Sequence, residues 1–193
     1  MTLSKPFTGR LPNLLLMSLC LLAAMPALAQ KVRLATSLGD IVVELDAQKA
    51  PKTVANFVKY VQAKHYDGLI FHRVIDGFMI QTGGYKPDLS EKPTRPPIAL
   101  ESRNGLSNQP GTVAMARSGV PDSATSQFFI NVGDNSRLDQ ANARDGEGYA
   151  VFGRVIEGID VVDKIRAAPT QPSGMHQNLP ATPVIIRKAT LEK

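Results

Sequence analysis

Short stretches of alternating apolar and polar residues recur along this chain, and this is the pattern of β-strands. Residues 31–46 form two such halves around a glycine turn at 38–40, which predicts a hairpin. Residues 71–84, FHRVIDGFMIQTGG, predict a second hairpin that turns at 76–77. Four further strands are predicted, at 111–118, 126–133, 149–156 and 183–193.

Two other stretches carry apolar residues at helical spacing. In residues 50–68, Pro51 suits the first turn of a helix and Gly68 is expected to end it. Residues 157–168 predict a second helix, with an apolar stripe that includes Ile165. Each helix has an apolar face that must cover something apolar, and the end of a sheet provides such a surface.

Long connections separate these elements. Proline and polar residues dominate 85–102, the segment 134–148 is polar, and 169–183 is predicted to be irregular. Many short strands with only two helices, neither placed regularly between strands, predict an all-β sheet closed on itself. Closure would remove the exposed edges of the sheet, and the two helices would cover its open ends.

The N-terminal residues have the pattern of a secretory leader. A basic start, an apolar run at 14–25 and the small-residue exit at 27–29 predict a signal peptide over residues 1–29, cleaved after Ala29. The apolar run is short for a membrane anchor. The only cysteine, Cys20, would leave with the leader, so residues 30–193 would form one cysteine-free domain of about 164 residues. That domain cannot be a disulfide scaffold or a thiol enzyme, and it suits an oxidising compartment.

Charge and motifs exclude several classes of function. The formal net charge is +5, or +3 without Lys5 and Arg10, and no basic tract occurs, so nucleic-acid binding is not expected. Neither a phosphate-binding P-loop nor a G-x-S-x-G motif is present. The three histidines, His65, His72 and His176, lack metal-ligand spacing, and a structural role is favoured for His72. An enzyme here would therefore work without a nucleophile, a metal or a cofactor.

Two polar residues interrupt the apolar hairpin 71–84. Burying the guanidinium of Arg73 or the amide of Gln81 without a partner would cost several kcal/mol. The two side chains are therefore either paired within the fold or directed at a ligand. Taken alone, Arg73 would be an ordinary strand arginine.

The ordered motifs of the chain resemble those of one family. FHRVIDGFMIQTGG, GTVAMARS, SATSQFFINVGDNSRLD and YAVFGRVIEGIDVVDKI are similar, in this order and spacing, to the cyclophilin-type peptidyl-prolyl isomerases, and with the leader the chain looks most like bacterial periplasmic members. The resemblance covers nearly all of 30–193. It implies a closed eight-stranded antiparallel β-barrel capped by two α-helices, which agrees with the pattern above.

The resemblance also implies a function. It makes the chain an isomerase of X-Pro peptide bonds that needs no cofactor and binds proline-containing unfolded or exported polypeptides in the periplasm. We expect a monomer with no stable membrane association once the leader is removed.

The substrate groove of that family lies outside the barrel. The resemblance makes Arg73 the central catalytic residue, with Gln81 beside it on the same strand pair. The substrate-binding residues that it implies are Phe78, Met79, Phe129 and Leu138 around the proline ring, Gln81, Gln127 and the main chain of Arg117 on the peptide backbone, and Ala116 and Tyr149 along the site.

Alternation along the strands tests part of this assignment. In SQFFI it sends Phe128 into the core and Phe129 outward. Phe78 and Met79 are also adjacent, so both can face the site only if the turn rotates Phe78. Without the resemblance, Arg117 and Arg137 would be read as solvated surface residues.

Two positions depart from the family pattern. Arg137 stands where many eukaryotic members have tryptophan, and Tyr149 stands where they have a pocket histidine. Bacterial relatives vary at both positions, so activity is expected to survive, whereas sensitivity to cyclosporin is not.

Two other functions remain to be weighed against isomerisation. A non-catalytic chaperone could use the same groove to grip proline peptides, although a pure binder would not need the donor on Arg73. A hydrolase built on His72 and a nearby serine has no supporting spacing.

Overall fold

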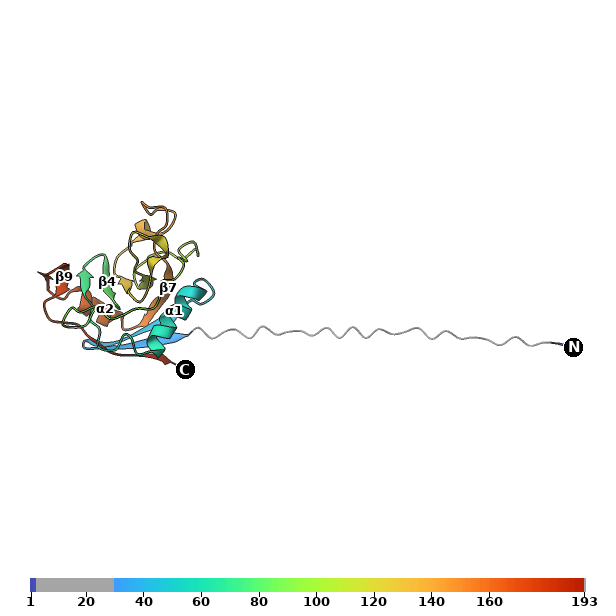
Figure 1. Ribbon diagram of the computed structural model, residues 1–193, viewed down its shortest axis with the longest axis horizontal. Coiled ribbons are helices and arrows are strands. Elements are labelled where there is room, and N and C mark those ends of the chain that lie inside the picture. The colour runs from blue at the N-terminus through green and yellow to red at the C-terminus, as the bar shows by residue number, and fades with distance from the viewer. Residues whose placement is uncertain (3–29, 193) are drawn as a thin grey trace.

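The computed structural model describes residues 1–2 and 30–192, so the predicted signal peptide falls almost entirely outside the described residues. Figure 1 shows the strands and helices gathered into one body. Eight strands form one sheet whose pairs are all antiparallel. They are β1 (Lys31–Thr36), β2 (Gly39–Leu45), β3 (Arg73–Ile75), β4 (Met79–Thr82), β5 (Thr112–Met115), β6 (Phe128–Asn131), β7 (Val151–Glu157) and β10 (Ile186–Glu192). No helix of the described residues is long and apolar enough to cross a membrane.

The two edges of this sheet meet through the segments that precede β3 and β10. The strand order is β10-β1-β2-β7-β5-β6-β4-β3, with no ladder between β3 and β10. Ile70 forms an antiparallel bridge with Ile185, and the Phe71 N–H donates to the Val184 carbonyl at 2.9 Å. The predicted eight-stranded antiparallel barrel is thus confirmed, with its closure made by a bridge rather than by a continuous strand pair.

Both predicted helices are present. They are α1 (Pro51–Gln62), which contacts β10, and α2 (Ile159–Arg166), which contacts β2, β3 and β4. The prediction that α1 extends to Gly68 is wrong. The chain leaves the helix earlier because Lys64 adopts a left-handed conformation, with φ of 54°, directly after the last turn.

The interior of the barrel is filled from the strands and from both helices. Val74, Ile80, Ile130 and Val113 lie opposite one another across β3, β4, β6 and β5, and all four belong to the main buried core. From the helices, Phe57, Tyr60, Val161, Val162 and Ile165 join the same core. The helices are therefore fixed by burial of their apolar faces, as amphipathic spacing predicts.

A separate hairpin lies in the segment predicted to be irregular. Strands β8 (Thr170–Ser173) and β9 (His176–Pro180) pair with each other, and β9 contacts β3 (Figure 1). The prediction for 169–183 is wrong because these strands are polar, with β8 mostly exposed and β9 mostly half-buried, and so lack the apolar alternation that predicts a strand.

Candidate active site

One row of side chains crosses the outer face of the sheet. Arg73 on β3 lies opposite Gln81 on β4, Gln81 lies opposite Phe129 on β6, and Phe129 lies opposite Ala114 on β5. Residues directly opposite one another in a sheet point to the same face. The backbone register therefore places a guanidinium and an amide at one end of a row whose other end is apolar.

The apolar end of the row is part of a second hydrophobic cluster, separate from the core. Its buried members are Met79, Ala114, Phe129 and Val151. Partly buried residues around them are Ile75, Phe78, Leu106, Ala116, Leu138 and Tyr149. Phe129 and Tyr149 meet edge to face, with ring centroids 5.8 Å apart. We call this set the outer cluster; it contains six of the residues that the family resemblance implies for substrate binding.

Phe128 and Phe129 face opposite ways. Phe128 is in the main core and packs edge to face on Phe57, whereas Phe129, 4% exposed, is in the outer cluster. Such an aromatic pair on one strand can serve both the core and an external site only because successive side chains alternate.

Phe78 reaches the outer cluster from a turn and not from a strand. β4 begins at Met79, and the Phe78 N–H closes the turn onto the Ile75 carbonyl at 3.1 Å. The turn packs tightly on the chain after β6, since a Cβ on Gly133 would lie 2.2 Å from the Gly77 carbonyl oxygen. Phe78 lies outside the strand, so the alternation of side chains along β4 does not determine its direction. Phe78 and its neighbour Met79 can therefore both belong to the outer cluster.

Arg73 is held by amides and retains most of its donors. Its Nη1 donates to Gln81 Oε1 at 3.3 Å, and Gln81 Nε2 donates to Gln127 Oε1 at 2.9 Å. The guanidinium carbon lies 5.8 Å from the centre of the Phe78 ring. Among residues 30–192, Arg73 takes part in none of the ion pairs. The exposed guanidinium is thus oriented by Gln81, and its remaining N–H groups are available to donate to a ligand.

Arg117 is a buried brace, so its interpretation as a solvated residue is wrong. Its side chain is 2% exposed, pairs with Asp145 and donates from Nε to the Gly148 carbonyl at 2.8 Å. The guanidinium also lies over the Tyr149 ring, 4.6 Å from its centre. Arg117 and the backbone N–H groups that follow Asp145 hold the pKa of that carboxyl far below its usual range. The Arg117 contacts fix the position of the Tyr149 ring. The preceding residue, Ala116, donates its N–H to the Gln127 carbonyl.

Leu138 and Arg137 lie at the rim of the outer cluster. Both belong to a short 3-10 helix, η2 (Ser136–Leu138), and the Tyr149 N–H donates to the Leu138 carbonyl at 2.9 Å. The exposed guanidinium of Arg137 stacks on Phe78, 4.8 Å from the ring centre. At the position where many eukaryotic relatives have tryptophan, this chain thus supplies a cation over an aromatic face.

A network of buried asparagines supports the site, and sequence reasoning missed it. Asn108, Asn131 and Asn135 are fully buried. Asn131 donates to the Asn108 side chain at 3.2 Å, and Asn135 donates to both Asn131 and the Phe78 carbonyl at 2.7 Å. Asparagine in loops usually indicates a turn. The available signal was Asn131, a polar residue that continues the strand SQFFIN.

His72 lies next to this site but inside the fold. It is 4% exposed, its Nδ1 has no hydrogen-bond partner among the described residues, and it packs on Tyr85 and His176 with ring centroids 4.8 and 5.8 Å away. Burial, together with the charges of His176 and Arg73, lowers the pKa of His72 to about 4. A hydrolase that uses His72 as its base gains no support from this packing.

The low pKa of His72 predicts a loss of stability in acid. The unfolded state binds a proton near the ordinary pKa of 6.5, whereas folded His72 does so only near 4. The free energy of unfolding should therefore fall as pH drops from about 6.5 to about 4, by at most about 3.4 kcal/mol at about 1.36 kcal/mol per pKa unit. Urea unfolding between pH 7 and 4.5 measures this slope.

The matched variant is His72→Phe, which keeps a ring against Tyr85 and does not titrate. Its stability should fall less steeply over the same pH range, since the carboxylates and His65 are common to both proteins. Parallel stability curves for the two proteins would show that His72 does not carry the effect.

The fold and the outer row define a β-barrel protein with a candidate site on the outer face of its sheet. The cyclophilin type peptidyl-prolyl cis-trans isomerase family model matches residues 31–191. The peptidyl-prolyl cis-trans isomerase cyp18 of Streptomyces antibioticus is 55% identical over 161 residues, which are 83% of this chain and 97% of that protein. Peptidyl-prolyl cis-trans isomerase B of Escherichia coli is 50% identical over 159 residues, which are 82% of this chain and 97% of that protein.

A solved structure agrees with these relatives. The crystal structure of a cyclophilin type peptidyl-prolyl cis-trans isomerase of Cryptosporidium parvum has a TM-score of 0.71 at 26% identity, and covers 86% of this chain and 98% of that one. The chain belongs to the cyclophilin-type peptidyl-prolyl cis-trans isomerase family, and it is an isomerase.

Proposed function

We propose that this isomerase accelerates rotation about X-Pro bonds in exported polypeptides and so assists their folding in the periplasm. The support for export is the N-terminal pattern of a basic start, an apolar run and a small-residue exit at 27–29, followed by a domain without cysteine. The support for the reaction is the outer row, in which Arg73 and Gln81 adjoin the outer cluster.

The reaction needs a group that favours a twisted amide. An X-Pro peptide bond rotates over a barrier of about 18–20 kcal/mol, and no bond is broken. At the top of the barrier conjugation is lost and the prolyl nitrogen becomes a hydrogen-bond acceptor. A donor directed at that nitrogen binds the twisted form better than either planar form, and only such differential binding accelerates the step. In our proposal Arg73 is this donor, and Gln81 orients it.

The size of the rate acceleration shows how much Arg73 and the outer cluster would each lower the rotation barrier. Bringing tens of seconds down to milliseconds is about 10⁴-fold, or roughly 5.5 kcal/mol at about 1.36 kcal/mol per decade. One well-placed donor supplies about 2.7–4 kcal/mol. The remaining 1.5–2.8 kcal/mol, roughly, would come from the apolar pocket of Phe78, Met79, Phe129 and Leu138, which holds the ring while the preceding carbonyl swings.

The peptide backbone would be held beside this pocket. The Gln81 side chain donates to the Gln127 side chain, and the Gln127 carbonyl accepts the N–H of Ala116, the residue before Arg117. Ala116 and Tyr149 belong to the outer cluster. The Cryptosporidium neighbour was also solved in the presence of the dipeptide Ala-Pro, with a TM-score of 0.70 at 26% identity to this chain. This supports proline-containing peptides as the ligands of the outer cluster.

Export has its own test. When the full chain is expressed in a Gram-negative host, we expect the protein in the periplasmic fraction with Gln30 as its first residue, because the small-residue exit precedes that position. Fractionation followed by N-terminal sequencing measures both. A control in which Ala27 and Ala29 are replaced by large residues should accumulate the uncleaved chain. Recovery of uncleaved wild-type chain from the cytoplasm would contradict the export proposal and leave the isomerase activity unaffected.

A further inference from the structure

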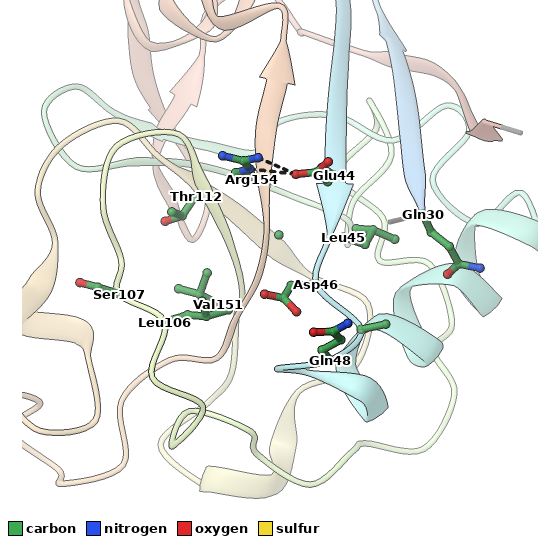
Figure 2. Close-up of a pocket in the computed structure, with 12 residues that line it drawn as sticks. Gln30, Glu44, Leu45, Asp46, Gln48, Leu106, Ser107, Thr112, Val151 and Arg154 are labelled. Carbon is green, nitrogen blue, oxygen red and sulfur yellow. Dashed lines mark hydrogen bonds and ion pairs between the residues drawn. The ribbon is translucent and has the colours of Figure 1, made fainter. Parts of the chain in front are cut away.

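A groove of about 630 Å³ lies on the outer face of β7, beside the outer cluster and away from Arg73. In Figure 2, Ser107, Leu106 and Val151 lie on one side of it, and Asp46, Gln48 and Leu45 lie on the other. The volume is that of a ligand pocket, and most of its surface is apolar. None of the site residues implied by the family resemblance lines it.

Hydrogen bonds hold both walls of the groove in place. On one side, Asn104 donates to the Val151 carbonyl at 2.8 Å and accepts the Leu106 N–H at 3.0 Å. On the other, the Asp46 N–H donates to the Phe152 carbonyl at 2.8 Å and the Leu45 N–H to the Gln30 carbonyl at 2.8 Å. A ligand would therefore meet a groove that is already shaped, with little ordering to offset its binding.

The groove adjoins the outer cluster and shares two residues with it. Val151 and Leu106 belong to the outer cluster and also line the groove. From Phe129 on β6 the sheet runs through β5 to β7 and then β2. Neighbouring strands are about 4.8 Å apart, so the groove lies about 10–14 Å from Phe129. An extended chain covers about 3.3–3.6 Å per residue, so three or four residues span that distance.

The chemistry of the groove favours an apolar side chain. Of its apolar lining residues, Leu106 and Val151 belong to the outer cluster, and Leu45 is buried in the main core. Of the charged residues at its rim, Glu44 and Arg154 pair with each other at 2.8 Å. The Asp46 carboxylate accepts the Lys49 N–H at 3.0 Å. The Glu44–Arg154 pair has no net charge, so Asp46 leaves a single negative charge at the rim. Along the apolar part of the groove, an apolar side chain gains by leaving water.

We propose that this groove is a remote subsite for the substrate polypeptide and takes an apolar side chain three or four residues from the isomerised proline. The proposal rests on the proposed function, since the same chain must occupy the outer cluster. Such a subsite binds the planar and twisted forms alike, because it lies outside the rotating bond. It should therefore lower KM and leave kcat unchanged.

Paired peptides test the subsite. A short Ala-Pro peptide is compared with longer ones that carry leucine, or serine as the matched control, three or four residues from the proline on either side. For the wild-type chain we expect KM about tenfold lower with leucine than with serine on one of the two sides, at the same kcat. NMR exchange measurements at several peptide concentrations give both constants.

Variants locate the effect. Gln48→Trp places a large ring at the rim of the groove, and the leucine-to-serine ratio should fall to about one. Gln171→Trp, the same change at an exposed site on β8, should keep the tenfold ratio. If the wild-type chain has nearly equal KM values for the leucine and serine peptides, the proposal is overturned. This holds whether the groove is empty or filled by another segment. So would a concentration-dependent dimer that Gln48→Trp abolishes, because the groove would then belong to a second copy. Turnover of the short peptide reports on the proposed function separately.

Discussion

Replacing Arg73 by alanine should lower kcat/KM for prolyl isomerisation by two to three decades and leave the fold intact. The loss follows from the about 2.7–4 kcal/mol that one well-placed donor contributes to a transition state. The fold should survive because Arg73 is exposed, and its one side-chain hydrogen bond among the described residues is the 3.3 Å contact with Gln81. Exchange NMR on Ala-Pro peptides measures the rate without a coupled protease.

Two further variants make the Arg73 result specific. Arg73→Lys keeps the charge but loses the planar fork of donors, so it should recover only a small part of the activity. Arg187→Ala, an exposed arginine on β10, should behave as the wild type. If Arg73→Ala folds normally and turns over at the wild-type rate, the proposed mechanism is wrong. If the wild type binds proline peptides without accelerating exchange, the protein acts as the non-catalytic chaperone.

Replacing Phe129 by alanine should lower both stability and activity. Truncating a buried phenylalanine costs about 3–5 kcal/mol of unfolding free energy, and Phe129 is 4% exposed. The outer cluster would also lose the ring that faces Tyr149 and lies in the row with Gln81. If the pocket supplies roughly 1.5–2.8 kcal/mol of the acceleration, activity per folded molecule should fall about ten- to hundredfold.

The neighbouring residue separates the two effects of the Phe129 change. Ile130→Ala truncates a side chain on the same strand that faces the core, so it should cost about 2–5 kcal/mol of stability and leave activity per folded molecule unchanged. Phe129→Leu, which keeps an apolar side chain in the outer cluster, should lose less activity than Phe129→Ala. Equal activity losses in Phe129→Ala and Ile130→Ala would mean that destabilisation alone accounts for them. Urea unfolding supplies the folded fraction in each case.

Polar segments were the hardest to predict from the sequence. The β8–β9 hairpin has little apolar surface, so it carries no alternation, and its place in the fold comes from the contact of β9 with β3. The early end of α1 at Gln62 depends on Lys64 taking a left-handed turn, which is a conformation that the sequence pattern associates with Gly68 instead. For the hairpin, a contact remote in the chain outweighed the local pattern.

The buried polar residues show the same limit. Arg117 reads as a surface residue near the end of a predicted strand, yet it pairs with Asp145 and donates to the Gly148 carbonyl. The buried asparagines lie up to 27 positions apart in the chain, from Asn108 to Asn135. They meet only when β6, which carries Asn131, packs with two loops. No periodicity marks such residues, because their partners are not their neighbours in the chain.

The sequence by itself determined the strands and helices that carry apolar alternation, the sheet closed on itself, and the opposite directions of Phe128 and Phe129. These follow from the periods of strands and helices, which are set by adjacent residues. Only the tertiary structure decided that Arg73, Gln81, Phe129 and Ala114 stand in one outward row, since this depends on the register between four strands. It also decided that a loop near Leu106 and the end of β2 enclose a groove beside that row, because long-range packing brings the two walls together.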